Sequence, residues 1–205
     1  MSEYMENVAN IVQILVSAFF VLQLLFKSRH VKEKTILYFM AGGIFCVFLG
    51  NVFWTLFLII RKELYPVYFS ACDGAWLGGY LFLISVLLMC RDKSIRQKHP
   101  WWCYLPPILV ILNAVKWVFD FGEPIRNGLW GIAMTMLAWY VAEGMWHAGL
   151  SEKMKRFKPF YWSVILFLLI ELLLFSSAGI VYSVINFLLT LTYVVMPLAL
   201  EKGVE

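Results

Sequence analysis

The residues best able to do chemistry in this chain are polar side chains that interrupt long apolar runs. An ionisable side chain at the centre of a membrane-spanning helix costs about 2.5–3.5 kcal/mol on insertion scales, so such residues are functional candidates. Most of them fall in the middle, or toward one side, of the spans predicted below: Asn51, Asp73, Asn113, Lys116, Asp120, Glu171 and Asn186. If their helix faces turn inward, they line one polar cavity that opens on that side.

Most of these residues also have a structural interpretation. Lys116 and Asp120 are four residues apart, so they face the same way on a helix and are able to pair. Asp73 falls where a helix N-cap or first-turn acid is favoured by the helix dipole. Interhelical hydrogen bonds, worth about 0.6 kcal/mol each, account equally well for the asparagines. These are Asn51, Asn113 and Asn186.

Glu171 is the hardest of the acids to explain as structural. It interrupts the apolar run 164–175 and has no charged neighbour in sequence. We expect it to be protonated, paired with Lys116, or in contact with a ligand. Glu143 and His147 are also four residues apart, and we interpret His147 as lying at the membrane surface.

Motifs of known chemistry are absent. Cys46, Cys72, Cys90 and Cys103 show neither a CxxC pair nor metal-type spacing. Nothing matches a phosphate-binding loop, a zinc-binding helix or a nucleophile elbow. The sequence therefore predicts no cofactor and no metal site, and it leaves catalysis undecided, with a non-enzyme favoured.

The elements that must position these side chains are membrane helices. Of 205 residues, 62% are hydrophobic and 15% are charged, whereas soluble domains carry about 25% charged residues. The basic residues that give the net charge of +4 stand in short clusters between apolar runs, which excludes a nucleic-acid partner in favour of the lipid bilayer.

A bilayer core of about 30 Å needs about 20 apolar residues per helix. The runs of this length lie at 8–27, 35–60, 69–90, 102–120, 127–149, 159–178 and 180–199. The last two are separated only by a short segment, Ser176 to Gly179, which predicts a helical hairpin. The prediction is an all-α bundle of seven transmembrane helices that forms a single domain, residues 1–205.

Lysine and arginine set the orientation of such a bundle, because cytoplasmic loops are enriched in them. They gather in alternate connections: Lys27, Arg29, Lys32 and Lys34, then Arg91, Lys93, Arg96 and Lys98, then Lys153, Lys155, Arg156 and Lys158. The opposite connections hold only Arg61, Lys62 and Arg126, diluted by Glu63, Asp120 and Glu123. We therefore expect the N-terminus outside, the C-terminus in the cytoplasm, and the polar residues mostly in the outer half.

Small residues in the second and third spans allow close helix contact. They are Ala41, Gly42, Gly43, Gly50, Gly74, Gly78 and Gly79. We expect these two spans to be packed closely together.

Residues 39–88 resemble the multi-helix membrane sensor regions that precede bacterial diguanylate cyclase and histidine kinase domains. Those regions show a Gly-Asp-x-x-Trp element, then a Pro and a Ser-Ala-x-Asp element, then an aromatic-rich Gly-Tyr helix. The matching residues are Gly50, Asn51 and Trp54, then Pro66, Ser70, Ala71 and Asp73, then Trp76, Gly79 and Tyr80. Asn51 replaces the acid of the first element, and the sequence ends at Glu205 without an output domain.

The resemblance implies a bacterial, sensor-like protein of the inner (cytoplasmic) membrane that works with a separate signalling protein. It adds two aromatic residues to the candidate ligand-binding set, which becomes Asn51, Trp54, Asp73, Tyr80, Asn113, Lys116, Glu171 and Asn186. We expect these residues to bind a small ligand or a lipid in an outward-facing polar cavity.

A second resemblance is to lysoplasmalogenase-like membrane hydrolases, which are small helical bundles with intramembrane acids and a Gly-Asp element. It implies an enzyme acting on lipid, with Asp73 and Glu171 as paired carboxylates for general acid–base catalysis. A transporter is a further alternative, with a path that continues inward from Glu171 toward Glu143 and His147. It is less favoured because seven spans do not divide into equal inverted repeats.

Overall fold

The computed structural model describes residues 2–61, 69–92, 98–121 and 123–205. They form long α-helices joined by short connections, and no described residue belongs to a strand. The elements are α1 (Ser2–Lys27), α2 (Lys34–Arg61), α3 (Ala71–Met89), η1 (Trp101–Tyr104), α4 (Leu105–Phe121), α5 (Pro124–Leu150), α6 (Glu152–Lys155), α7 (Lys158–Phe175) and α8 (Gly179–Val204). Of the residues interpreted from the sequence, Lys62, Glu63, Pro66, Lys93 and Arg96 lie outside the described ranges.

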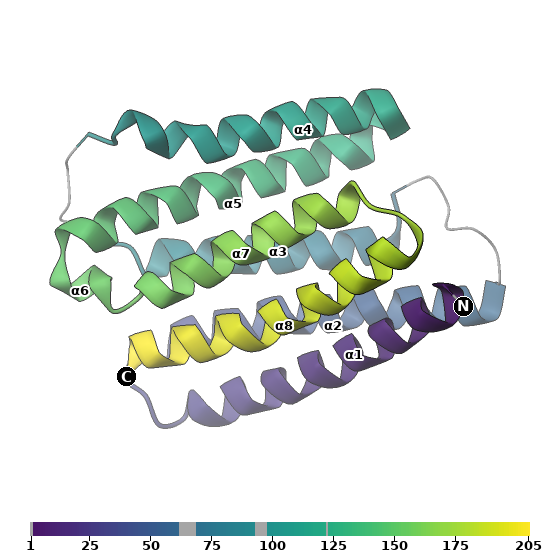
Figure 1. The fold of residues 1–205 in the computed structure, drawn as a ribbon. Helices are drawn as coiled ribbons and strands as arrows, with labels where there is room; N and C mark the ends of the chain where they lie inside the picture. Colours follow the sequence, from purple (N-terminus) through teal and green to yellow (C-terminus); the bar gives the residue numbers. More distant parts are fainter. Residues whose placement is uncertain (1, 62–68, 93–97, 122) are drawn as a thin grey trace.

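The long helices lie side by side in one bundle (Figure 1). Helix α1 packs against α2 and α8, and α3 packs between α2 and α5. Helix α7 contacts α5 and α8, while α4 packs on the outside of α5. The two chain ends lie at opposite ends of the bundle (Figure 1). Six of these helices therefore surround a common interior, while α4 lies outside α5. Trp117 of α4 still reaches the core, where its ring packs on Phe175 of α7 with centroids 4.8 Å apart.

Six helices in the described part of the chain are long and apolar enough to cross a membrane, which indicates a multi-pass membrane protein. They are Asn7–Lys27, Lys34–Ile60, Ala71–Met89, Trp101–Asp120, Lys158–Phe175 and Gly179–Val204. Helix α5 is not among them, although it has 27 residues. Its polar side chains, including Asn127, Glu143 and His147, are buried inside the bundle rather than turned outward.

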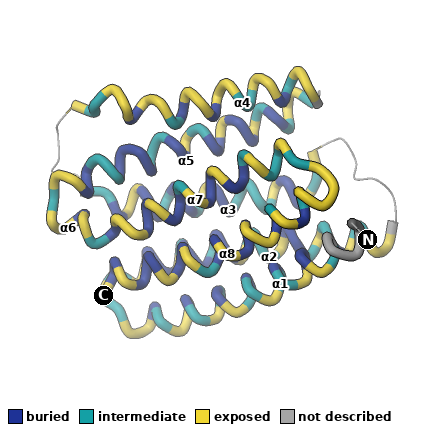
Figure 2. The backbone as a smooth tube through the Cα atoms, in the orientation of Figure 1, coloured by how far each residue is buried: buried dark blue, intermediate teal, exposed yellow. Residues whose placement is uncertain are grey.

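The outward faces of the helices are apolar, as lipid contact requires. Exposed residues follow the outer side of each helix (Figure 2), and many of them are large and hydrophobic. Ile60 is 74% exposed and Phe119 is 84% exposed. A soluble monomer rarely presents so much contiguous apolar surface, so the hydrocarbon of a bilayer is the natural solvent for these faces.

Local sequence explains where the helices begin and end. Helix α7 ends at Phe175 and α8 begins at Gly179, which confirms the predicted hairpin. Gly179 has φ of 61°, a left-handed conformation that glycine adopts without the steric cost of a Cβ. The third span begins at Ala71 rather than at 69, because Ser70 caps the helix through a capping box with Asp73.

The predicted close contact between the second and third spans is confirmed. A Cβ placed on Gly79 would lie 3.2 Å from the carbonyl oxygen of Gly43, and one on Gly43 would lie 3.4 Å from that of Gly79. A larger residue at either position would push α2 and α3 apart.

Apolar side chains fill the middle of the bundle. Leu137 and Val141 of α5, Val86 of α3 and Val164 of α7 are each at most 1% exposed. By their positions along the helices, they separate the polar groups near the α7–α8 hairpin from those near the C-terminal end of α5. The bundle thus has two distinct polar regions, one toward each end.

Candidate ligand-binding cavity

A cavity of about 530 Å³ lies among six of the long helices, toward the end that contains the α7–α8 hairpin and the start of α3. Helices α1, α2, α3, α5, α7 and α8 all contribute to its walls, and no described residue of α4 does. Polar side chains from all of these helices reach it: Asn10, Gln13, Asn51, Asp73, Arg126, Asn127, Glu171, Tyr182 and Asn186. One space within the bundle therefore gathers polar groups that are far apart in sequence.

Six of the eight predicted site residues line this cavity. They are Asn51, Trp54, Asp73, Tyr80, Glu171 and Asn186. Asn113 and Lys116 are not part of its lining, because both belong to α4 on the outside of α5. The sequence predicts how deep each residue lies in the bundle. It does not predict which face of α4 points toward the interior.

The two residues of α4 have local partners instead. Lys116 Nζ lies 3.8 Å from Asp120 Oδ2, and the Lys116 side chain is 68% exposed. The expected pairing within the helix is thus confirmed, and Lys116 forms no ion pair with Glu171. Asn113 Nδ2 donates to the carbonyl oxygen of Leu109, one turn earlier in the same helix, at 2.9 Å. This hydrogen bond lies within one helix, so it supports neither of the two interpretations of Asn113, an interhelical hydrogen bond or a place in the ligand site.

Asp73 is a fully buried carboxylate with several hydrogen-bond donors. Its Oδ2 accepts from the Ser70 backbone at 3.0 Å and from the Ser70 hydroxyl at 2.6 Å. Its Oδ1 accepts from Arg126 Nε at 3.0 Å and from Trp130 Nε1 at 3.2 Å, both of α5. The predicted role as a first-turn acid is confirmed, and the same carboxylate also ties α3 to α5.

Glu171 presents the opposite case. It is 6% exposed, it lines the cavity, and none of the ion pairs among the described residues includes it. The Tyr80 hydroxyl lies beside its carboxylate, but it is buried and completes no hydrogen bond of good geometry. Within the part of the chain that the structure describes, Glu171 is therefore a buried acid without a cation to balance it.

Aromatic rings surround this part of the cavity. The ring centroids of Tyr80 and Phe167 are 5.4 Å apart, and those of Phe167 and Tyr193 are 6.1 Å apart. Trp130 meets Tyr80 edge to face at 5.4 Å. Phe167 and Glu171 are four residues apart on α7, so they share one helix face. The carboxylate thus lies close to several aromatic side chains.

A polar network joins α1 to α8 at the cavity wall. Gln13 Nε2 donates to Asn186 Oδ1 at 2.7 Å and to the Asn186 carbonyl at 2.9 Å. Asn186 Nδ2 in turn donates to Asn10 Oδ1 at 3.1 Å. This confirms the structural interpretation of Asn186 as an interhelical hydrogen-bond group.

Asn51 plays a similar part between α2 and α3. Its Oδ1 accepts from Trp76 Nε1 at 3.0 Å, while its Nδ2 is buried without a partner. Gly50 makes the contact possible, because a Cβ at that position would overlap the Trp76 indole. Trp54, one turn further along α2, has its ring centroid 6.1 Å from that of Trp76.

Several residues of the site were missed from the sequence. Asn10 and Gln13 face inward together with Ser17, and all three are at most 4% exposed. Their spacing of three and four residues marks one polar stripe on an otherwise apolar helix, a signal that the first span did contain. In the sequence, Arg126 is one of the basic residues of a predicted connection between spans. Nothing in the sequence indicates that it contacts Asp73.

The interpretation of His147 as a membrane-surface residue is wrong. His147 has no exposed surface and Glu143 is 3% exposed. The segment before η1 covers them: Arg91 and His99 both contact the Glu143 carboxylate, at 2.6 and 3.1 Å. A polar cluster therefore lies buried at the end of the bundle opposite the cavity.

Comparisons of this chain with family models, with curated proteins and with solved structures find no match.

Proposed function

We propose that this chain is a sensor-like membrane protein of seven spans, whose cavity binds a small ligand that carries a cationic amine on an apolar body. Helix α5 is the seventh span in this proposal. Its 27 residues correspond to about 40 Å of helix, and it lies alongside α3, α4 and α7. Its polar side chains face the interior, where they need no contact with lipid.

The single observation that carries the proposal is the environment of Glu171. An ionised carboxylate in a dry interior is costly unless a cation or several hydrogen bonds compensate it. The ion pairs of the described residues leave Glu171 without such a cation. A ligand amine placed in the cavity supplies one.

The rest of the lining fits the same ligand class. The ionisable side chains of the wall include the acids Asp73, Glu123 and Glu171 and one base, Arg126. Aromatic faces attract cations through their quadrupoles, and Tyr80, Phe167 and Tyr193 stand near the carboxylate. The volume of about 530 Å³ is within the range of about 300–1,000 Å³ typical of small-molecule sites.

The basic connections support an orientation in which the cavity faces outward. They include Lys27, Arg91, Lys153 and Lys158, at the end of the bundle away from the cavity. The bacterial inner membrane is what the resemblance to the sensor regions implies. A ligand that enters from outside and bridges α3, α7 and α8 changes the packing of helices that reach the cytoplasm. In this proposal, a separate signalling protein responds to that change.

Two alternatives receive less support. A lipid hydrolase needs Asp73 as a free general acid or base, but Asp73 is bound to Ser70, Arg126 and Trp130. A transporter needs a path from the cavity to the opposite end, where Leu137, Val141 and Val164 are packed.

The test uses two probes that differ only in charge: benzyltrimethylammonium and its neutral carbon isostere, neopentylbenzene. The purified protein in lipid nanodiscs is titrated with each probe, and its thermal unfolding is followed. We expect saturable stabilisation by the ammonium and at least a 10-fold weaker effect of the isostere. Glu171→Gln is expected to remove this preference.

Lys116→Gln is the matched control, because Lys116 is a predicted site residue that lies outside the cavity. It should respond to the ammonium like the unmodified protein. Equal responses to both probes would show that Glu171 does not recognise charge. A response that is unchanged in Glu171→Gln would contradict the proposed site.

A further inference from the structure

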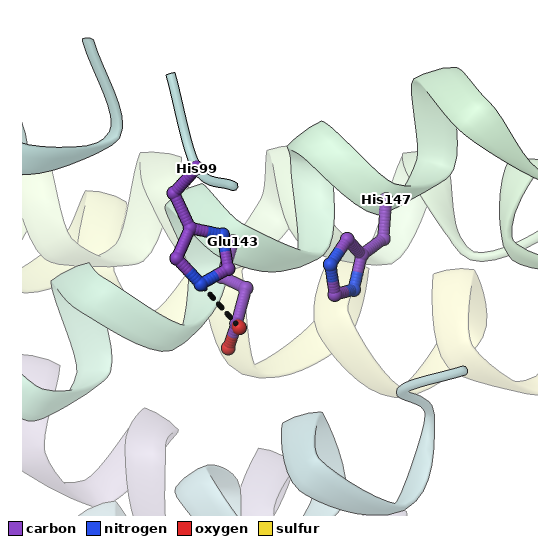
Figure 3. A group of neighbouring side chains, drawn as sticks. All are labelled: His99, Glu143 and His147. Carbon is purple, nitrogen blue, oxygen red and sulfur yellow. Dashed lines mark ion pairs between the residues drawn. The ribbon is translucent and has the colours of Figure 1, made fainter. Parts of the chain in front are cut away.

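A compact group of metal-ligand side chains lies at the end of the bundle opposite the cavity. His99 precedes η1, whereas Glu143 and His147 are four residues apart on α5 and therefore share one face. One ligand atom from each of the three lies within 4.8 Å of the others. In Figure 3, the Glu143 carboxylate is flanked by the two imidazole rings, and the dashed line marks its ion pair with His99.

The histidines of this group lack partners that buried imidazoles need. His147 has no exposed surface, and neither Nδ1 nor Nε2 has a hydrogen-bond partner. Nδ1 of His99 is also buried without a partner, while its Nε2 lies 3.1 Å from Glu143 Oε1. Leaving a buried polar group unsatisfied costs about 1–3 kcal/mol, so a bound species is expected to occupy the space between these atoms.

We propose that His99, Glu143 and His147 bind a divalent transition-metal ion, with Zn²⁺ as the best fit. Two imidazole nitrogens and one carboxylate oxygen are a common zinc set, and they leave a fourth position open. Ligand atoms of a tetrahedral zinc site lie about 3.3 Å apart, since each bond is about 2.0–2.1 Å long. The three ligand atoms lie within 4.8 Å of one another, so metal binding must draw them closer by about 1.5 Å.

The neighbouring groups are compatible with a cation here. Arg91 Nη2 forms an ion pair with Glu143 Oε1 at 2.6 Å. The ion pair with His99 uses the same oxygen, so Oε2 is the atom offered to the metal. Contacts of this kind orient metal-binding carboxylates. Arg91 and Asp92 both act electrostatically on His147. The negative charge of Asp92 offsets the positive charge of Arg91. Trp139 packs edge to face on His99, with ring centroids 5.3 Å apart, and fixes the direction of that imidazole.

Sequence spacing gave no sign of this site, because His99 is far from the other two residues along the chain. The site is independent of the cavity and of the amine proposal. Cys103 Sγ lies 3.8 Å from the carbonyl oxygen of Ala142, on the same turn of α5 as Glu143. The Cys103 sulfur therefore lies near Glu143, and replacing Cys103 tests whether the protein or water fills the fourth position on the metal.

The experiment measures zinc directly. Protein purified in detergent with chelator is titrated with Zn²⁺ and desalted, and metal per chain is determined by mass spectrometry. We expect one equivalent in the unmodified protein and at least a 10-fold loss of affinity in His147→Asn and in His99→Asn. Co²⁺ in place of Zn²⁺ should give the visible absorption of a four-coordinate ion.

The control is His30→Asn, because His30 is the one histidine of the chain outside the group and is exposed. It should retain one equivalent. His99 stands in a connection and is partly exposed, so His99→Asn is expected to fold even if His147→Asn does not. Absence of saturable binding at micromolar Zn²⁺ would contradict the metal site. Equal binding in His99→Asn would show that the zinc binds without His99, and it would overturn the proposed ligand set.

Discussion

Two buried carboxylates line the same cavity and have opposite surroundings. On the α3–α5 wall, Asp73 accepts hydrogen bonds from Ser70, Arg126 and Trp130. On the α7–α8 wall, Glu171 forms no ion pair among the described residues, and the Tyr80 hydroxyl beside it lacks good hydrogen-bond geometry. Burial of an acid alone therefore does not identify a ligand-binding site. A compensated acid holds helices together, whereas an uncompensated one is available to a ligand.

Replacing Asp73 should have the largest effect on stability. Asp73→Asn leaves Arg126 without its counter-charge and removes the acid of the capping box. Breaking a buried pair costs about 3–5 kcal/mol, and we expect about 2–3 kcal/mol here because Arg126 is 25% exposed. Unfolding by SDS in mixed micelles measures it. A loss below about 0.5 kcal/mol would remove the contrast with Glu171.

Replacing Gly50 tests the wall next to Asp73. Gly50→Ala places a methyl group where the Trp76 indole lies, so Trp76 must move and its hydrogen bond to Asn51 is lost. Overpacking of this kind costs about 1–3 kcal/mol, and the same SDS unfolding assay measures it. Gly128→Ala is the matched control, since an added Cβ there meets no atom within 4 Å. Equal stability of the two variants would mean that Trp76 is not held as described.

Replacing Glu171 should have a smaller effect of opposite sign. In the ligand-free protein, Glu171→Gln removes an uncompensated acid and keeps the shape of the side chain. We expect stability to rise by up to about 1 kcal/mol, in contrast to the loss in Asp73→Asn. Thermal unfolding of both variants in the same nanodiscs checks the signs. A large loss in Glu171→Gln would indicate a structural partner for this acid.

Replacing Lys116 should have the smallest effect. Its pair with Asp120 is exposed, and such pairs are worth about 0.3–0.5 kcal/mol or less. Lys116→Ala should therefore change neither SDS unfolding nor the ammonium titration beyond that amount. A marked loss of binding would place α4 in the site, against the observed packing.

Composition and the length of the apolar runs were enough to predict an all-α membrane bundle and its hairpin at Ser176–Gly179. They were also enough to predict the close contact of α2 with α3, because small residues allow helices to approach. The depth of each polar residue in the bundle could be predicted from its position along its apolar run. Six residues predicted from depth or from the sensor-region resemblance therefore line the cavity, Glu171 and Asn186 among them.

Rotation about each helix axis was harder to predict. Lys116 and Asn113 lie at the right depth, but α4 packs mainly on α5, and these two residues do not line the cavity. Gln13, the partner of Asn186, does lie on a polar stripe that the sequence of the first span contains. Arg126 could not be predicted because its partner, Asp73, belongs to a distant helix. The burial of His147 depends in the same way on a contact from His99, which the local sequence of α5 does not encode.

The most direct test of the central claim is a structure of the protein with benzyltrimethylammonium bound, determined in nanodiscs. We expect the ammonium nitrogen within about 5 Å of the Glu171 carboxylate, with the aromatic rings of Tyr80, Phe167 and Tyr193 around it. Ammonium located on the lipid-facing surface or beside Asp73, with the space next to Glu171 empty, would rule out the proposed site.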